Sequence, residues 1–262
     1  MQTETLRVQD LNLHYLASGT GPDVLFIHGW ASSCRMWQGA MEFLAPHFRC
    51  WAIDLAGFGD SDKPANGWYT VPNFTAYVRA FAREAGIERA HVVGHSMGGM
   101  IALDLAATHR DFVQRLVVVN PVVTGRTRLQ VHRLINRGFD RPLLSLTMQV
   151  WPVVVKSPFG RLLAAQVGRN PQDLTKATIE SALGGLRALT GYDTTSRLPQ
   201  IAAPSLVVVG ARDLVVSPRE GRLAAERVPD AQLVVMPTGH SPVDDKAAEF
   251  NSLLSSFLAA PA

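Results

Sequence analysis

The 262-residue sequence has few cysteines, a small net charge and no long apolar run. Cys34 and Cys50 follow no metal-ligand spacing and supply no disulfide framework, so we expect two free thiols and no metal or other cofactor. No stretch of about 18 apolar residues is present that could span a bilayer. The first ten residues also lack the basic flank and apolar run of a signal peptide. We therefore expect a cytoplasmic protein without a membrane span.

Internal repeats, low-complexity segments and long polar linkers are also absent from the sequence. The net charge of +3 is too small to indicate nucleic-acid binding. The hydrophobic content of 47% is that of a globular chain that can bury a large core. The sequence leaves open whether the protein is a monomer or a homodimer.

Short apolar runs alternate with longer amphipathic segments along most of the chain. This alternation predicts an α/β fold with a mostly parallel sheet that helices cover on both faces. The predicted strands are 24–27, 49–53, 90–94, 116–120, 206–209 and 232–236, and the runs 6–8 and 11–16 add an edge hairpin, which makes eight strands. The predicted helices are 37–46, 71–85, 97–108, 218–227 and 246–258.

The alternation breaks over residues 124–198, which show helical patterning divided by prolines but no clear strand. We interpret this stretch as a helical insertion between two core segments, 1–123 and 199–262. The insertion contains eleven Lys and Arg against four Asp and Glu, so it carries +7 while the rest of the chain carries −4.

Gly94-His95-Ser96-Met97-Gly98 follows one of the predicted buried strands and precedes an apolar helix. A Gly-X-Ser-X-Gly pattern in this context places a serine on a sharp strand-to-helix turn, where a base and a substrate can both reach it. The glycines are needed because a Cβ at either flank would collide with the adjoining strand or helix. Ser96 is therefore the candidate nucleophile.

A serine nucleophile needs a histidine base, and a carboxylate must orient that histidine. His240 lies in a Pro- and Gly-bounded loop between the last strand and the last helix, whereas the other seven histidines have weaker claims. Asp213 lies in the loop after the strand 206–209, before the good helix start Ser217-Pro218. Loops that follow parallel strands meet at one sheet edge, so both residues are expected on the side of Ser96.

Other polar residues compete for the role of the acid. Asn120 ends a neighbouring strand, but an amide cannot stabilise a cation equally well. Asp54, Asp60 and Asp62 lie in a Gly-rich loop, where turn formation and bonds to the backbone are the simpler explanation.

The order Ser96, Asp213, His240 resembles that of the α/β-hydrolase superfamily, of the cap-bearing serine esterase, C–C hydrolase and perhydrolase type. The segments that carry the resemblance are His28-Gly29-Trp30, Asp54 to Pro64, Gly94 to Gly99, Gly210 to Asp213 and Gly239 to Pro242. The resemblance implies an oxyanion hole formed by the backbone N–H groups of Trp30 and Met97. It also implies that residues 124–198 form a cap over the active site.

We therefore predict a serine hydrolase of carboxylic esters with short to medium acyl chains. A serine disfavours the dehalogenase and epoxide hydrolase reactions of this fold, because its attack on a saturated carbon would leave an inert ether. Two alternatives stay open: a C–C bond hydrolase of vinylogous diketones, and a noncatalytic ligand-binding protein on the same scaffold. Trp30 is expected either to line the substrate pocket or simply to pack.

The basic charge of the insertion suggests a partner for the cap. Arg126, Arg133, Arg137 and Arg141 are spaced to share one helical face, which is either solvated or a docking surface for an anionic acyl carrier. Carrier docking would match biotin-pathway esterases, which the chain resembles in its His-Gly-Trp and Gly-Phe-Gly segments. Apolar residues that either line the acyl pocket or seat the cap are Leu143, Leu144, Leu146, Met148, Val150 and Trp151.

Overall fold

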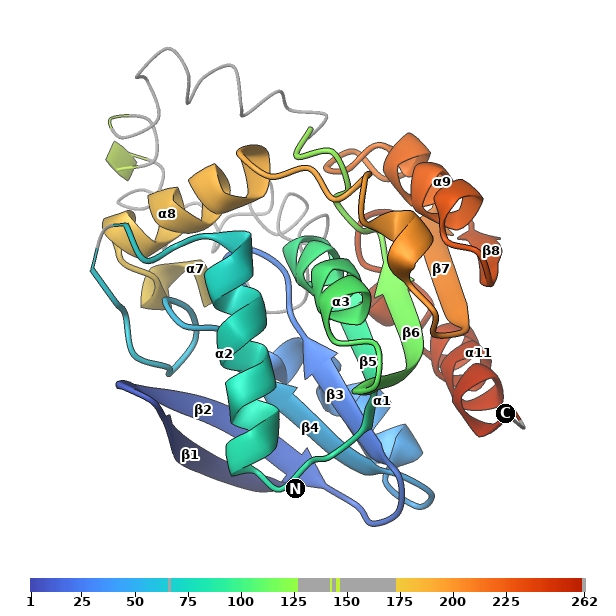
Figure 1. The fold of residues 1–262 in the computed structure, drawn as a ribbon, viewed down its shortest axis with the longest axis horizontal. Coiled ribbons are helices and arrows are strands. Elements are labelled where there is room, and N and C mark those ends of the chain that lie inside the picture. The colour runs from blue at the N-terminus through green and yellow to red at the C-terminus, as the bar shows by residue number, and fades with distance from the viewer. Residues whose placement is uncertain (66, 127–141, 143–144, 147–172, 261–262) are drawn as a thin grey trace.

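The computed structural model describes residues 1–65, 67–126, 142, 145–146 and 173–260 (Figure 1). Its centre is one sheet of eight strands in the order β1-β2-β4-β3-β5-β6-β7-β8. The strands are β1 (Gln2–Val8), β2 (Leu11–Ser18), β3 (Asp23–Ile27), β4 (Arg49–Ile53), β5 (Ala90–His95), β6 (Val113–Val119), β7 (Ser205–Gly210) and β8 (Ala231–Met236).

Only the first two pairings of the sheet, β1 with β2 and β2 with β4, are antiparallel. All pairings from β4 to β8 are parallel, so the predicted eight-stranded and mostly parallel sheet is confirmed. The loops that leave the carboxyl ends of these parallel strands therefore gather along one edge. This edge is where the predicted site residues lie.

The described helices and 3-10 turns lie between or after these strands. They are η1 (Cys34–Trp37), α1 (Gln38–Leu44), α2 (Val71–Glu84), α3 (Met97–Thr108), α7 (Asp173–Lys176), α8 (Ile179–Thr190), η2 (Leu198–Gln200), α9 (Pro218–Arg227), α10 (Pro242–Asp245) and α11 (Ala247–Ala259). The predicted bounds of α3 and α9 agree with the structure, whereas the predicted helix 37–46 divides into η1 and α1. In the described part of the chain no helix is long and apolar enough to cross a bilayer.

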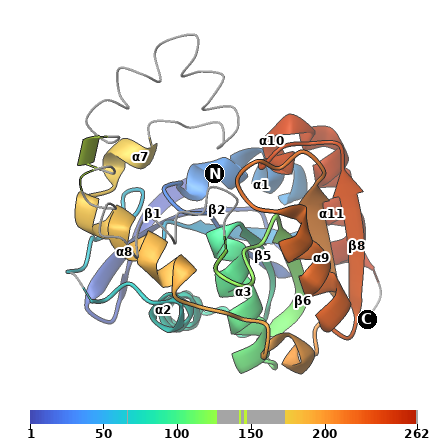
Figure 2. The same cartoon turned by 90° about the horizontal axis from the view of Figure 1, so that it is seen from above.

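The central strands β3, β5, β6 and β7 are buried on both faces, and their alternate residues enter two separate hydrophobic clusters. Leu25 and Ile27 of β3 pack in the cluster that includes α2, α3 and α9, while Val24 and Phe26 pack in the cluster that includes α1 and α11. Figure 2 shows the sheet between these two layers of helices. Side-chain alternation along a strand explains this division.

The segment 124–198 leaves the core after β6 and returns before β7. Its described residues contain α7 and α8, which agrees with a helical insertion, and they contribute no strand to the sheet. The points of departure and return are joined directly, because Thr194 donates to the Val123 carbonyl from its backbone N (2.9 Å) and from its hydroxyl (3.0 Å). The boundaries 1–123, 124–198 and 199–262 remain a proposal.

Candidate active site

Ser96 lies at the junction of β5 and α3 in a strained backbone conformation, with φ 55° and ψ −114°. Such a conformation is rare outside glycine and occurs mainly where surrounding structure enforces it. A Cβ added to Gly94 would lie 2.3 Å from the Gly98 carbonyl oxygen, and one added to Gly98 would lie 2.3 Å from the Ile27 oxygen. The two glycines therefore let β5, α3 and the end of β3 approach closely around Ser96.

His240 and Asp213 meet at the same edge, although they are 27 positions apart in the sequence. The distance between His240 Nδ1 and Asp213 Oδ2 is 2.7 Å, and the side chains are only 5% and 1% exposed. The second oxygen of Asp213 accepts from the backbone N–H groups of Val215 (2.7 Å) and Val216 (2.9 Å). Because the carboxylate only accepts, the imidazole donates through Nδ1, which leaves Nε2 as its proton acceptor.

Two residues outside the predicted set contact His240. His95 Nε2 and Asn120 Nδ2 each lie 2.8 Å from the His240 backbone carbonyl oxygen. The His95 and His240 rings are 4.7 Å apart between centroids. His95 lies inside the serine motif and Asn120 follows β6 directly. Their position at the carboxyl edge of the sheet was the sequence signal that could have placed them near the candidate site.

Met97 follows Ser96 directly, and the loop that carries Trp30 runs close to the serine turn. Met97 is the first residue of α3, where backbone N–H groups have no carbonyl four residues earlier in the helix. Trp30 follows Gly29, where an added Cβ would lie 3.2 Å from Ser96 Cβ, so this loop runs beside the turn. The Trp30 indole donates to the Ala182 carbonyl in α8 at 2.8 Å, so the side chain packs against the insertion.

His28 fixes the loop that carries Trp30. Its Nε2 accepts from the Leu55 backbone N–H at 2.9 Å, so its Nδ1 carries the proton and donates to the Gly29 carbonyl at 2.7 Å. Burial lowers the pKa of His28, which favours this neutral form. The loop after β3 is thereby tied to the loop after β4.

His14 and Asp54 form a second buried His–Asp pair, with 2.8 Å between His14 Nδ1 and Asp54 Oδ2. Asp54 also accepts from the backbone N–H groups of Cys34 (2.6 Å) and Asp60 (2.8 Å). Burial alone would raise the pKa of Asp54, but these donors and the nearby His28 hold it well below its ordinary value. Asp54 therefore links three segments of chain rather than acting as the acid for His240.

The neighbouring acids of that loop have similar structural contacts. Asp62 accepts from the Asn12 backbone N–H at 2.7 Å, and Asp60 forms ion pairs of 2.6 Å with Arg35 and Lys176. The Asp62 contact agrees with the predicted bonds to the backbone, whereas the Asp60 carboxylate forms ion pairs between side chains instead. Asp60 additionally connects the loop to α7.

Within the described residues, the only group with the donor atoms and spacing for a metal ion is His14, Cys34 and Asp54. Both carboxylate oxygens of Asp54 already accept hydrogen bonds, and Cys34 Sγ lies 3.6 Å from His14 Nδ1. Burial is the main cause that raises the pKa of the Cys34 thiol, so thiolate ligation is disfavoured. The trio fits a hydrogen-bonded core better than a metal centre.

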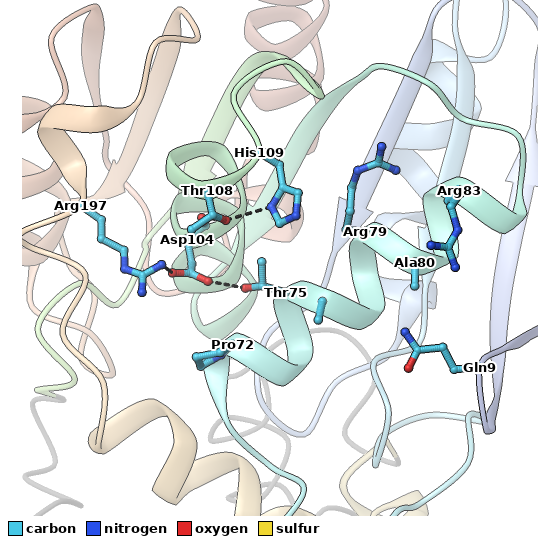
Figure 3. A pocket seen from close by; sticks show the side chains of 11 residues that line it. Gln9, Pro72, Thr75, Arg79, Ala80, Arg83, Asp104, Thr108, His109 and Arg197 are labelled. Atoms are coloured by element: carbon cyan, nitrogen blue, oxygen red, sulfur yellow. Dashed lines mark hydrogen bonds and ion pairs between the residues drawn. The ribbon is translucent and has the colours of Figure 1, made fainter.

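A cavity of about 490 Å³ lies between α2 and the C-terminal end of α3 (Figure 3). Asp104 in its wall is held by Thr75 (2.7 Å), Tyr192 (2.6 Å) and Arg197 (2.8 Å). Because Ser96 precedes the other end of α3, roughly 15 Å away along the helix, this cavity is not part of the serine site. Its buried carboxylate instead connects α2 and α3 to the chain returning from the insertion.

The predictions for the basic and apolar residues of the insertion fall largely outside the described residues. Arg133, Arg137 and Arg141 are outside them, as are Leu143, Leu144, Met148, Val150 and Trp151. Arg126 is described and exposed, and Leu146 is 58% exposed. The exposure of Leu146 favours neither of its two predicted roles, lining an acyl pocket or seating the cap.

The sequence matches known proteins over most of its length. A family described as alpha/beta hydrolase fold matches residues 22–247. A Yersinia enterocolitica protein provisionally named carbamate hydrolase RutD is 31% identical over 242 residues, covering 90% of this chain and 86% of its own. The pimeloyl-[acyl-carrier protein] methyl ester esterase of Vibrio atlanticus is 27% identical over 259 residues, covering 94% and 97%.

The fold is also similar to that of solved structures. The enol-lactonase of Burkholderia xenovorans LB400 aligns with a TM-score of 0.81 over 98% of this chain and 100% of its own, at 24% identity. At this identity the likeness concerns the fold.

Proposed function

Since this chain belongs to the α/β-hydrolase fold family, we propose that it is a serine hydrolase that cleaves carboxylic esters of short to medium acyl chain through an acyl-enzyme on Ser96. The observation that carries the proposal is the buried 2.7 Å contact between His240 and Asp213 at the sheet edge that holds the strained Ser96 turn. Base, orienting acid and nucleophile are drawn from loops after three different strands.

In the proposed reaction, His240 Nε2 takes the Ser96 hydroxyl proton while Ser96 Oγ attacks the ester carbonyl. Asp213 holds the Nδ1 proton and stabilises the imidazolium that forms. His240 then gives the proton to the leaving alcohol as the carbon–oxygen bond breaks, which leaves an acyl-enzyme. The same histidine activates a water that releases the acid and restores Ser96.

The negative charge of the tetrahedral intermediate needs donors that point at the developing oxyanion. We assign this role to the backbone N–H groups of Met97 and Trp30. The Met97 position at the start of a twelve-residue helix adds a favourable dipole. A donor of this kind typically contributes about 2.7–4 kcal/mol to transition-state stabilisation.

The names of the relatives support carbonyl chemistry. One is named for hydrolysis of a methyl ester on an acyl carrier, and the other, provisionally, for hydrolysis of a carbamate. Both reactions begin with attack on a carbonyl carbon, which a serine can perform. A carrier-linked ester is therefore included in the proposed substrate range.

The proposal is tested by replacing the nucleophile. We expect Ser96→Ala to lower hydrolysis of nitrophenyl acetate, butyrate and octanoate by at least about 10³-fold, because acyl transfer loses its covalent step. A fluorophosphonate probe should label wild-type Ser96 and leave the variant unlabelled. Assays of a methyl ester, a carbamate and a dienoate ring-cleavage product in parallel compare the substrate classes.

Ser205→Ala is the matched control, because Ser205 is also buried but lies at the opposite, amino end of β7. It should keep wild-type activity and labelling. Persistence of ester hydrolysis in Ser96→Ala above about one part in 10³ would overturn the proposal. Turnover of the dienoate in preference to every ester would favour the C–C hydrolase alternative.

A further inference from the structure

The backbone carbonyl of His240 accepts two side-chain hydrogen bonds from the sheet. One donor is His95 at the end of β5, and the other is Asn120 directly after β6, each at 2.8 Å. Both side chains are buried. A buried carbonyl that loses its donors is costly, so these contacts restrain where the His240 backbone can lie.

Of its two neutral tautomers, His95 can make this contact only in the one that carries its proton on Nε2. A carbonyl oxygen only accepts, so the His95 proton must be on Nε2. Burial, reinforced by the neighbouring His240, lowers the pKa of His95 to about 3. The ring therefore stays neutral beside His240 and does not place a second positive charge next to the proposed imidazolium.

Asn120 connects the acid loop with the base loop. Its Oδ1 accepts from the Gly210 backbone N–H at 2.7 Å, while its Nδ2 donates to the carbonyls of His240 (2.8 Å) and Gly239 (3.3 Å). Gly210 precedes Asp213 by three residues. Asn120 itself has φ 44°, a left-handed conformation that asparagine tolerates better than most residues.

The two loops are also in close backbone contact. A Cβ added to Gly210 would lie 2.0 Å from the Gly239 carbonyl oxygen. The amide of Asn120 bonds to both loops at this point, so one side chain sets the spacing between the residues that carry acid and base.

We propose that His95 and Asn120 are positioning residues, which hold His240 through its backbone carbonyl so that its imidazole meets both Asp213 and Ser96. This inference rests on the proposed function, because it assigns His240 the role of base. Neither residue touches the reacting atoms in this proposal. Their effect is therefore on the rate of the chemical step rather than on substrate binding.

The test uses variants that remove single contacts. His95→Leu removes the donor, whereas His95→Gln offers an amide N–H near the position of Nε2. Asn120→Asp keeps an oxygen for the Gly210 N–H and tolerates the left-handed backbone, but replaces the donor to His240 with an acceptor. His91→Leu is the control, since His91 is also buried on β5 but lies at its other end.

We expect His95→Leu and Asn120→Asp each to lower kcat for nitrophenyl butyrate by about 10- to 100-fold, with KM changed less than about threefold, because small displacements of catalytic groups are costly. His95→Gln should recover much of the rate, and His91→Leu should keep it. The low-field NMR signal of the proton between His240 and Asp213 should shift or broaden only in the two impaired variants.

An unchanged kcat in both His95→Leu and Asn120→Asp would overturn the proposal, as would a rise in KM alone. A loss of rate in His91→Leu equal to that in His95→Leu would also overturn it, because it would indicate a general effect of burial. Ser96→Ala separates this failure from failure of the proposed function: if Ser96→Ala abolishes hydrolysis while His95→Leu and Asn120→Asp both keep the wild-type kcat, only the present inference fails. If His95→Leu does not fold, Asn120→Asp and His95→Gln decide the outcome.

Discussion

The described part of the chain contains two buried His–Asp pairs, and the two pairs have nearly the same contact distance. His240 and Asp213 are 2.7 Å apart, and His14 and Asp54 are 2.8 Å apart. They differ in what the second carboxylate oxygen does. In Asp213 it bonds to N–H groups of its own loop, while in Asp54 it bonds to Cys34 in a separate segment.

The comparison shows that a His–Asp pair is not by itself a catalytic feature. The side chain beside His14 that most resembles a nucleophile is the thiol of Cys34. Its sulfur lies 3.6 Å from His14 Nδ1, which is the same nitrogen that bonds to Asp54. A base for that thiol would need its free nitrogen turned toward the sulfur. Burial also raises the thiol pKa, so the cysteine stays protonated. The His14 pair is therefore structural, and the proposed catalytic role belongs to the pair beside the serine turn.

The largest expected effect is a difference in kcat between variants of the two His–Asp pairs. Asp213→Asn should lower kcat by about 10⁴-fold, because the amide favours the wrong His240 tautomer. Asp54→Asn, assayed at a temperature where it is folded, should keep kcat within about threefold because it lies outside the proposed machinery. Steady-state kinetics on nitrophenyl butyrate measures both. Equal losses of kcat in the two folded variants would contradict the assignment of catalysis to the His240–Asp213 pair alone.

The second effect concerns the stability of the protein and its dependence on pH, which we expect the His14–Asp54 pair to influence. Asp54 accepts three buried hydrogen bonds, and a hydrogen bond to a charged group is worth about 1.5–3 kcal/mol, so Asp54→Asn should unfold at a markedly lower urea concentration than wild type. The folded pKa of Asp54 is below its ordinary value of 3.8, so its contribution is present above about pH 4 and is lost as the pH falls below it. Urea titrations between pH 3 and 7 should show a smaller acid loss in Asp54→Asn than in wild type. The same acid loss in both proteins would contradict this assignment.

The smallest effect concerns the thiol of the structural pair. Cys34→Ala should leave kcat unchanged and lower the free energy of unfolding by about 1–2 kcal/mol through lost packing. In the native protein a thiol reagent should modify Cys34 only on unfolding, because the side chain is buried. Modification in the native state accompanied by loss of ester hydrolysis would instead make Cys34 part of the active site.

Sequence patterns predicted the elements that have sharp local signals. The bounds of α9 follow from the Ser217-Pro218 start, where Ser217 Oγ accepts from the Arg219 N–H, and β4 was predicted at its observed bounds. The edge strand β1 is longer than the predicted run 6–8, since it begins at Gln2. Its first four residues, Gln2 to Thr5, are polar and exposed, so they show no apolar alternation that could reveal a strand.

The loop positions of Asp213 and His240 were also predictable, because parallel-sheet topology sends both loops to one edge. The partners of Asp54 and His240 were not. His14 and Asp54 are 40 positions apart, and the donors to the His240 carbonyl are 145 and 120 positions away from it. Such contacts depend on strand order and on the conformation of single residues, for which a sequence pattern gives no signal.

The paired bonds between Val123 and Thr194 have a consequence for how such an enzyme diversifies. A segment whose two ends are held side by side outside the sheet can be exchanged for another of different length without altering strand register. If residues 124–198 form the proposed cap over the site, we expect chimaeras joined at these two positions to take their substrate range from the donor of the inserted segment and their reaction chemistry from the recipient. The two properties could then change independently during evolution or in engineering.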